Sequence, residues 1–65
     1  SNGFEEVAEM LERTIPYWRP LAALLQKQAY NAVDENYFDQ ILANLTTITE
    51  LERKAANILQ KIYTP

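Results

Sequence analysis

Acidic side chains are the most frequent reactive groups in this chain, and several of them stand four residues apart. Glu5 and Glu9 form one such pair, and Glu35 and Asp39 form another. Two carboxylates can serve glycoside or metal chemistry only when they face each other in a cleft. Both pairs fall on the polar sides of predicted helices, where carboxylates are ordinarily solvated. The pairs therefore favour a solvated helix surface over a catalytic centre.

The other side chains offer little further chemistry. The chain has no His and no Cys, so it lacks the most common general base, a thiol nucleophile and the usual zinc ligands. A di-iron bundle requires Glu-x-x-His, which cannot occur here. Ser1 is the only serine and stands at the N-terminus, and no threonine has a base placed beside it by spacing. The sequence predicts a protein that is not an enzyme and that uses no metal and no cofactor.

Nucleic-acid binding is the next function to weigh, because three short helices are also the ground plan of a helix-turn-helix protein. The candidate contacts are Tyr17, Trp18 and Arg19, together with the adjacent pair Arg53 and Lys54. Six basic residues against nine acidic ones give a net charge of −3. A surface that follows phosphates needs clustered basic residues, and these are scattered. A small DNA-associated transcriptional regulator that binds as a dimer is kept as the alternative function.

Aromatic residues make up 11% of the chain. Trp, Tyr and Arg are enriched at the energetic centres of protein interfaces, because they bury a large area and keep a polar group. Trp18 and Phe38 are expected to lie in the core, and the tyrosines to be half-buried or at an interface. The segment from Tyr17 to Arg19 lies between two prolines, which should hold it rigid. It is the best single candidate for a binding site.

The elements that position these residues are predicted to be helices. Helix one should run from about Gly3 to Thr14, with a stripe of apolar residues on one side. Asn2 and Glu5 match a capping box, and Glu9 and Arg13 are spaced for an ion pair. The apolar stripe consists of Phe4, Val7, Ala8, Leu11 and Ile15.

Helix two should begin at either Pro16 or Pro20, because proline suits the first turn of a helix. The segment between these prolines is interpreted as a tight connection. The helix is expected to end near Ala32, and Asp34 is a good N-cap for the next one.

The longest signal is an apolar stripe along the C-terminal half, which recurs every three or four residues. It predicts a helix from about Glu35 to Tyr63. The alternative is a break near Thr46, because Thr46 to Thr49 are four β-branched residues, which suit a helix poorly. No Gly or Pro stands there, so the continuous helix is favoured. The stripe consists of Phe38, Ile41, Leu42, Leu45, Ile48, Leu51, Ala55, Ile58, Leu59 and Ile62.

Short connections predict that consecutive helices pack antiparallel. The predicted fold is an all-α, three-helix antiparallel bundle with a long C-terminal helix, or four helices if that helix breaks near Thr46. The spacing slips between Ile48 and Leu51, which argues against a strict zipper. So long a stripe needs more cover than 65 residues supply, so self-association, most simply as a homodimer, is expected. The candidate partner-binding residues are Tyr17, Trp18, Arg19, Tyr30, Tyr37, Leu45, Ile48, Leu51 and Ile58.

Composition sets the remaining bounds. Residues 1–65 are expected to form a single small domain, in which Ser1 and Asn2 could be a tag remnant and the whole could be cut from a longer protein. No apolar run reaches the about 18 residues that span a bilayer, and the acidic N-terminus does not resemble a signal peptide, which favours the cytoplasm. The predicted function is a non-catalytic protein–protein interaction or oligomerisation module, a small adaptor or regulator. An acidic mimic that uses Glu5, Glu6, Glu9 and Glu12 is a minor alternative.

Overall fold

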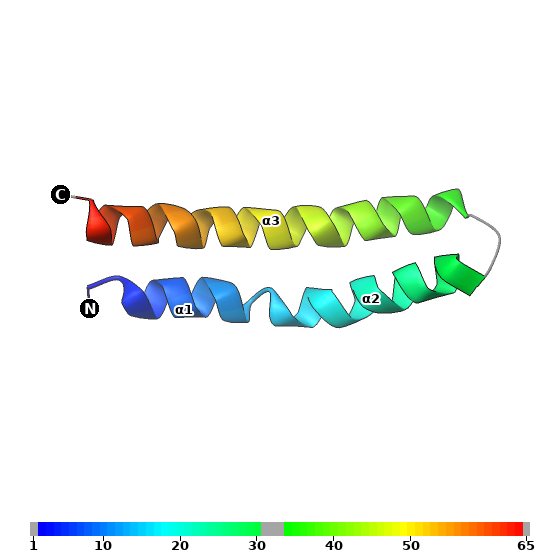
Figure 1. Ribbon diagram of the computed structural model, residues 1–65, viewed down its shortest axis with the longest axis horizontal. Helices are drawn as coiled ribbons and strands as arrows, with labels where there is room; N and C mark the ends of the chain where they lie inside the picture. The colour runs from blue at the N-terminus through cyan, green and yellow to red at the C-terminus, as the bar shows by residue number, and fades with distance from the viewer. Residues whose placement is uncertain (1, 31–33, 65) are drawn as a thin grey trace.

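The computed structural model describes residues 2–30 and 34–64 and shows a helical hairpin (Figure 1). Its helices are α1 (Phe4–Glu12), α2 (Ile15–Tyr30) and α3 (Glu35–Tyr63). Helices α1 and α2 follow each other in line, and both pack on α3, which runs back beside them (Figure 1). We call α1 and α2 together the first rod. The end that carries both termini is the open end, and the opposite end is the closed end.

The all-α prediction is confirmed, but the three-helix antiparallel bundle and the four-helix variant are wrong. Two rods lie side by side and form a body of 51 × 16 × 14 Å. The reason lies at Arg13, which follows α1 and keeps a right-handed helical backbone with φ −65° and ψ −19°. Because the chain leaves α1 without reversing, α2 continues in the direction of α1, and the predicted antiparallel turn does not form.

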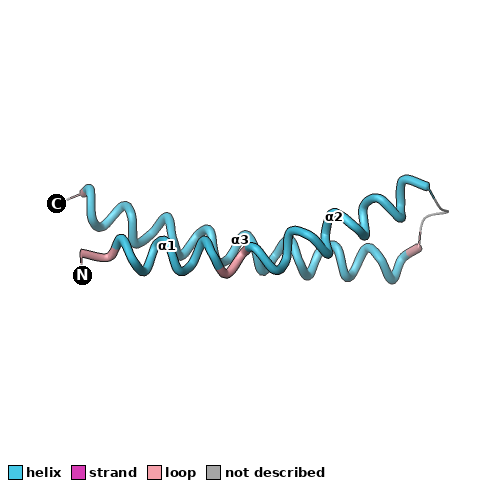
Figure 2. The backbone as a smooth tube through the Cα atoms, turned by 90° about the horizontal axis from the view of Figure 1, so that it is seen from below, coloured by secondary structure: helices cyan, strands magenta, loops and turns pink. Residues whose placement is uncertain are grey.

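The break between α1 and α2 centres on Thr14. Pro16 cannot donate a backbone hydrogen bond to Glu12, so the helical ladder is interrupted there, as the sequence predicted. The Thr14 N–H bonds to the carbonyl of Leu11 at 3.1 Å, and the Tyr17 N–H bonds to the carbonyl of Thr14 at 3.0 Å. The predicted tight connection between the two prolines is instead the first part of α2, which starts at Ile15 and continues through Pro20. Figure 2 shows that only a short non-helical segment separates α1 from α2.

Helix α3 is continuous, which confirms the favoured prediction. Asp34 caps it, since its side-chain oxygen accepts a hydrogen bond from the Asn36 N–H at 2.9 Å. In the β-branched segment, the Thr47 hydroxyl donates to the Ala43 carbonyl at 3.1 Å, and Ile48 is buried against the first rod. Burial of Ile48 in the contact with the first rod offsets the weak helix propensity of this segment.

The core is a single narrow seam between the rods. Its buried members are Leu21, Ile48, Ala55 and Thr14. The inward-facing residues alternate in steps of four and three on both rods, and the break at Thr14 does not disturb the alternation, so the expected slip near Ile48 is wrong. On the first rod they are Gly3, Val7, Met10, Thr14, Tyr17, Leu21, Leu24 and Gln28, and on α3 they are Tyr37, Ile41, Asn44, Ile48, Leu51, Ala55, Ile58 and Ile62.

The open end closes through Gly3. Its φ of +99° is a left-handed conformation that favours glycine, and a Cβ there would lie 3.0 Å from Cδ1 of Ile62. The Asn2 side-chain oxygen accepts a hydrogen bond from the Phe4 N–H at 3.2 Å, instead of forming the predicted capping box with Glu5. The predicted ion pair between Glu9 and Arg13 is present at 3.3 Å.

Three further expectations can be compared with the structure. Trp18 and Phe38 were expected in the core but are 47% and 60% exposed, because the seam between two rods is too narrow to hold them. The predicted end of helix two at Ala32 lies outside the described residues, as does Ser1. Among residues 2–30 and 34–64, no helix combines the length and the apolar composition needed to cross a membrane.

Candidate protein–protein interface

Large apolar side chains remain exposed along the whole hairpin. On the first rod, Phe4, Leu11, Trp18 and Leu25 follow each other at intervals of seven residues, and each is between 41% and 51% exposed. Seven residues are close to two helical turns, so the four side chains lie in one line. On α3 the equivalent exposed side chains are those of Phe38, Leu42, Leu45, Leu59 and Tyr63.

These two lines lie on the same side of the hairpin. Each residue named above stands one or four positions after an inward-facing residue. Successive helical residues turn by about 100°, so in an antiparallel pair these positions point to the same side on both rods. The Phe4 and Tyr63 rings confirm this at the open end, where they meet edge to face with centroids 6.0 Å apart.

We call this surface the apolar face. Smaller side chains fill the spaces between the large ones on the first rod and in the second half of α3. The apolar face consists of Phe4, Ala8, Leu11, Ile15, Trp18, Ala22, Leu25 and Ala29 on the first rod, and of Phe38, Leu42, Leu45, Ala56, Leu59 and Tyr63 on α3, all of them exposed.

Two polar residues interrupt the apolar face near its middle. Thr49 stands seven residues after Leu42, and Glu52 stands seven residues after Leu45. Both are exposed. The face is therefore apolar at both ends and carries one carboxylate and one hydroxyl at its centre.

The opposite side of the hairpin carries exposed charged residues among uncharged ones. Because successive helical residues turn by about 100°, the residue just before an inward-facing residue lies on the side opposite to the apolar face. The side chains at or next to these positions are Glu6, Glu9, Arg13 and Lys27 on the first rod, and Glu50, Lys54 and Lys61 on α3, and all are exposed. Charged side chains of both signs are present there, interspersed with uncharged residues such as Pro16, Pro20, Ala23 and Ala43, so this side is a mixed surface.

The exposed area of the molecule is large for its mass. A compact monomer of 7.5 kDa exposes about 4,200 Å² by the usual scaling of surface with mass. This chain exposes 5,208 Å², about 1,000 Å² more. The radius of gyration of 15.3 Å also exceeds the about 11 Å of a compact domain of this length. A two-rod hairpin has one seam to bury, and the apolar face is what remains uncovered.

The nine predicted partner-binding residues fall into three groups. Trp18 and Leu45 lie on the apolar face. Five others face the seam between the rods, and the remaining two are exposed elsewhere. The seam residues are Tyr17, Tyr37, Ile48, Leu51 and Ile58, and the two exposed elsewhere are Arg19 and Tyr30.

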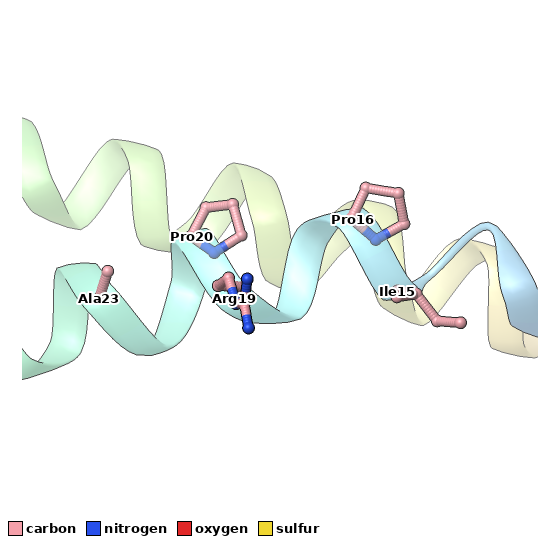
Figure 3. A pocket seen from close by; sticks show the side chains of 5 residues that line it. All are labelled: Ile15, Pro16, Arg19, Pro20 and Ala23. Atoms are coloured by element: carbon pink, nitrogen blue, oxygen red, sulfur yellow. The ribbon is translucent and has the colours of Figure 1, made fainter.

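The segment from Tyr17 to Arg19 does not form one contact element. Because its residues follow one another along α2, Tyr17 points into the seam, Trp18 lies on the apolar face and Arg19 points outward. The Trp18 indole N–H donates to the Thr14 hydroxyl at 3.3 Å, which holds the ring beside the break. Arg19 instead lines a shallow groove along α2 with Ile15, Pro16, Pro20 and Ala23 (Figure 3).

Sequence reasoning missed most of the apolar face on the first rod. Phe4 and Leu11 were assigned to the same apolar stripe of helix one as Val7. The available signal was the seven-residue spacing of Phe4, Leu11, Trp18 and Leu25, which persists across the break. It was hidden because each rod carries two adjacent apolar lines, one for the seam and one for the apolar face.

The carboxylates do not converge in the fold. In the described part of the chain, no three His, Cys, Asp or Glu side chains gather where they could hold a metal ion. Glu5 and Glu9 are exposed, as are Glu35 and Asp39.

Comparison with known proteins gives no relative: no family model, no curated protein and no solved structure matches this chain.

Proposed function

We propose that this chain is a non-catalytic protein–protein interaction module that works by association through its apolar face. The observation that carries this proposal is that fourteen apolar residues stay exposed on one side of the hairpin, whereas the other side mixes exposed charged and uncharged residues. Monomeric proteins rarely expose contiguous apolar patches larger than a few hundred Å², and larger patches mark interaction surfaces.

The area and the shape of the surface support a helical partner. The excess exposure of about 1,000 Å² is close to the about 800 Å² that each partner buries in a standard interface. Two parallel lines of large apolar side chains on neighbouring helices are the kind of surface that further helices pack against in bundles. The net charge of −3 disfavours an anionic membrane as the occupant.

The proposal is tested by the molar mass in solution, measured by light scattering over a concentration series. We expect an oligomer that dissociates on dilution. Leu42→Glu, on the apolar face, should raise the dissociation constant at least about a hundredfold, since each copy loses about 1.5 kcal/mol of side-chain burial.

The matched control is Thr46→Glu, which adds the same charge to the same helix at an exposed position outside the apolar face. It should leave the mass unchanged. A chain that stays monomeric at every concentration, or a mass that falls equally in both variants, would contradict association through this face.

A substitution in the seam would not serve this test. Ile58 is half-buried, and one of its methyl groups would lie 3.4 Å from a Cβ added at Gly3. Ile58→Asp therefore disrupts the hairpin itself, whereas Leu45→Asp acts on a side chain that is 41% exposed. We expect Leu45→Asp to reduce association while the helical content stays unchanged.

A further inference from the structure

The charged residues that stand in the lines of the apolar face are all acidic. Glu52 stands seven residues after Leu45, and Glu35 stands seven residues before Leu42, at the closed end. The six basic residues of the chain lie outside these lines, either just before an inward-facing residue or two positions after one. They are Arg13, Lys27, Lys54 and Lys61 in the first case, and Arg19 and Arg53 in the second.

Two contacts give the register between the rods. At the open end, Gly3 lies against Ile62, and near the closed end, the Lys27 ammonium lies 5.9 Å from the centroid of the Tyr37 ring. Residues are therefore level with each other when their numbers add up to about 65. Glu52 stands about three residues from the middle of α3, which is a distance of about 5 Å along the helix.

No basic residue of the hairpin compensates the charge of Glu52. Arg13 is level with it, but lies on the opposite side of the hairpin and pairs with Glu9 at 3.3 Å. The residues of the apolar face closest to this level on the first rod are Leu11 and Ile15. In the described part of the chain, Glu52 has no ion-pair partner. Its carboxylate is exposed to water in the isolated hairpin, and it loses that water when the face is covered.

A second copy of the chain brings a second carboxylate to the same region. Because Glu52 stands close to the middle of the hairpin, two fully overlapping faces place both copies of it within about 10 Å of each other along the bundle axis, whichever way the closed ends lie. Like charges that face each other across an interface lower its affinity, and opposite charges select the right partner. Self-association therefore carries a charge penalty, which a basic residue of a different partner would offset.

From these observations, and resting on the proposed function, we infer that the apolar face selects its partner by charge. It binds a helical surface of another chain, with a lysine or arginine at the centre of that surface's apolar side, in preference to a second copy of itself. Glu52 is the residue that makes this selection. Self-association is then the weaker reaction, and such a partner displaces one copy from the oligomer.

The chain with Glu52→Lys serves as the probe for such a partner, because it presents the same apolar side chains with a basic residue in place of the carboxylate. The original chain, isotopically labelled, is mixed with the unlabelled probe, and native mass spectrometry measures the mixed and unmixed assemblies. We expect the equilibrium constant for forming mixed from unmixed assemblies to exceed its random value at least about tenfold.

Glu50→Lys is the matched control for the mixing experiment. It makes the same change of charge on the same helix, two residues away, at an exposed position on the opposite side of the hairpin. Its mixtures with the original chain should contain the random share of mixed assemblies. Circular dichroism verifies that both variants keep the helical content of the original chain.

A second measurement needs no mixing. Glu52→Gln removes the charge and nearly keeps the shape of the side chain, so it should lower the dissociation constant of self-association at least about fivefold. Glu50→Gln removes a charge on the opposite side and should leave that constant unchanged. Light scattering over a concentration series compares the two variants with the original chain.

The outcomes separate this inference from the proposed function. Random mixing of the Glu52→Lys probe with the original chain overturns charge selection and leaves association through the apolar face in place. The same holds if Glu52→Gln associates no more tightly than Glu50→Gln. A chain that stays monomeric, both alone and mixed with the probe, contradicts the inference and the proposed function together.

Discussion

Two small, uncharged residues, Gly3 and Thr14, decide how the rods meet. Gly3 allows the chain to enter α1 in a left-handed conformation directly against Ile62. Thr14 is 5% exposed, and its hydroxyl donates to the Leu11 carbonyl at 2.7 Å while it accepts from the Trp18 indole. Gly3 thus allows the rods to meet at the open end, and Thr14 connects Leu11 of α1 to Trp18 of α2 through its hydroxyl group.

Gly3→Ala should lower the free energy of unfolding by about 1–3 kcal/mol, through a positive φ that alanine adopts poorly and through contact with Ile62. Urea denaturation measures the change. In an Ile62→Val background, which removes the methyl group 3.0 Å from the added Cβ, the same substitution should cost less. An equal cost in both backgrounds would mean that backbone strain alone is responsible.

Thr14→Val should lower the free energy of unfolding by about 1–2 kcal/mol, because the indole N–H of Trp18 loses its acceptor while the side-chain volume is kept. Thr14→Ser keeps the hydroxyl and should cost less than Thr14→Val. Trp18 is the only tryptophan in the chain, so its fluorescence reports both the unfolding and the local change. If serine cost as much as valine, packing of the methyl group and not the hydrogen bond would be the main contribution.

At the scale of the elements, the fold depends on the break between α1 and α2, which interrupts the helix without reversing the direction of the chain. The two prolines of α2 differ in their effect. Pro16 lies in the first turn, where a missing N–H removes no hydrogen bond within α2. Pro20 lies deeper in α2, where the N–H would have bonded to the carbonyl of Pro16. The interruption between α1 and α2 therefore comes from Pro16, and Pro20 weakens α2 itself.

Pro20→Ala should raise the free energy of unfolding by about 1 kcal/mol or more, since it restores a backbone hydrogen bond at an exposed position. Pro16→Ala is the matched control and should change stability little or lower it slightly. Thermal unfolding followed by circular dichroism compares the two variants. A stabilisation by Pro16→Ala that exceeds that of Pro20→Ala would contradict this account of the break.

At the scale of the whole molecule, the shape explains why association is expected. A single rod-to-rod seam buries few side chains completely, and Ile48, at 2% exposed, is the most enclosed of the described residues. A chain of this length has little stability of its own without staples or partners. A second seam formed by the apolar face would double the contact that each rod makes.

The stability of the assembled protein should therefore depend on its concentration. For a dimer, each tenfold increase in concentration favours the folded assembly by about 1.4 kcal/mol, and the melting temperature rises accordingly. Calorimetry across a concentration series measures the shift, and Leu42→Glu should remove it. A melting temperature that does not change with concentration would mean that the hairpin is stable as a monomer.

The sequence by itself determined the helices, because apolar periodicity, proline positions and capping residues act within a few residues of each other. It fixed α3 from Glu35, the Asp34 cap and the ion pair between Glu9 and Arg13. It did not determine whether Arg13 and Thr14 would reverse the chain, because that depends on two backbone angles that no residue type there dictates. Tertiary structure decided that α1 and α2 run in line on α3. It thereby divided the wide apolar stripes into a buried seam and an exposed face, since two rods can cover only one side of each other.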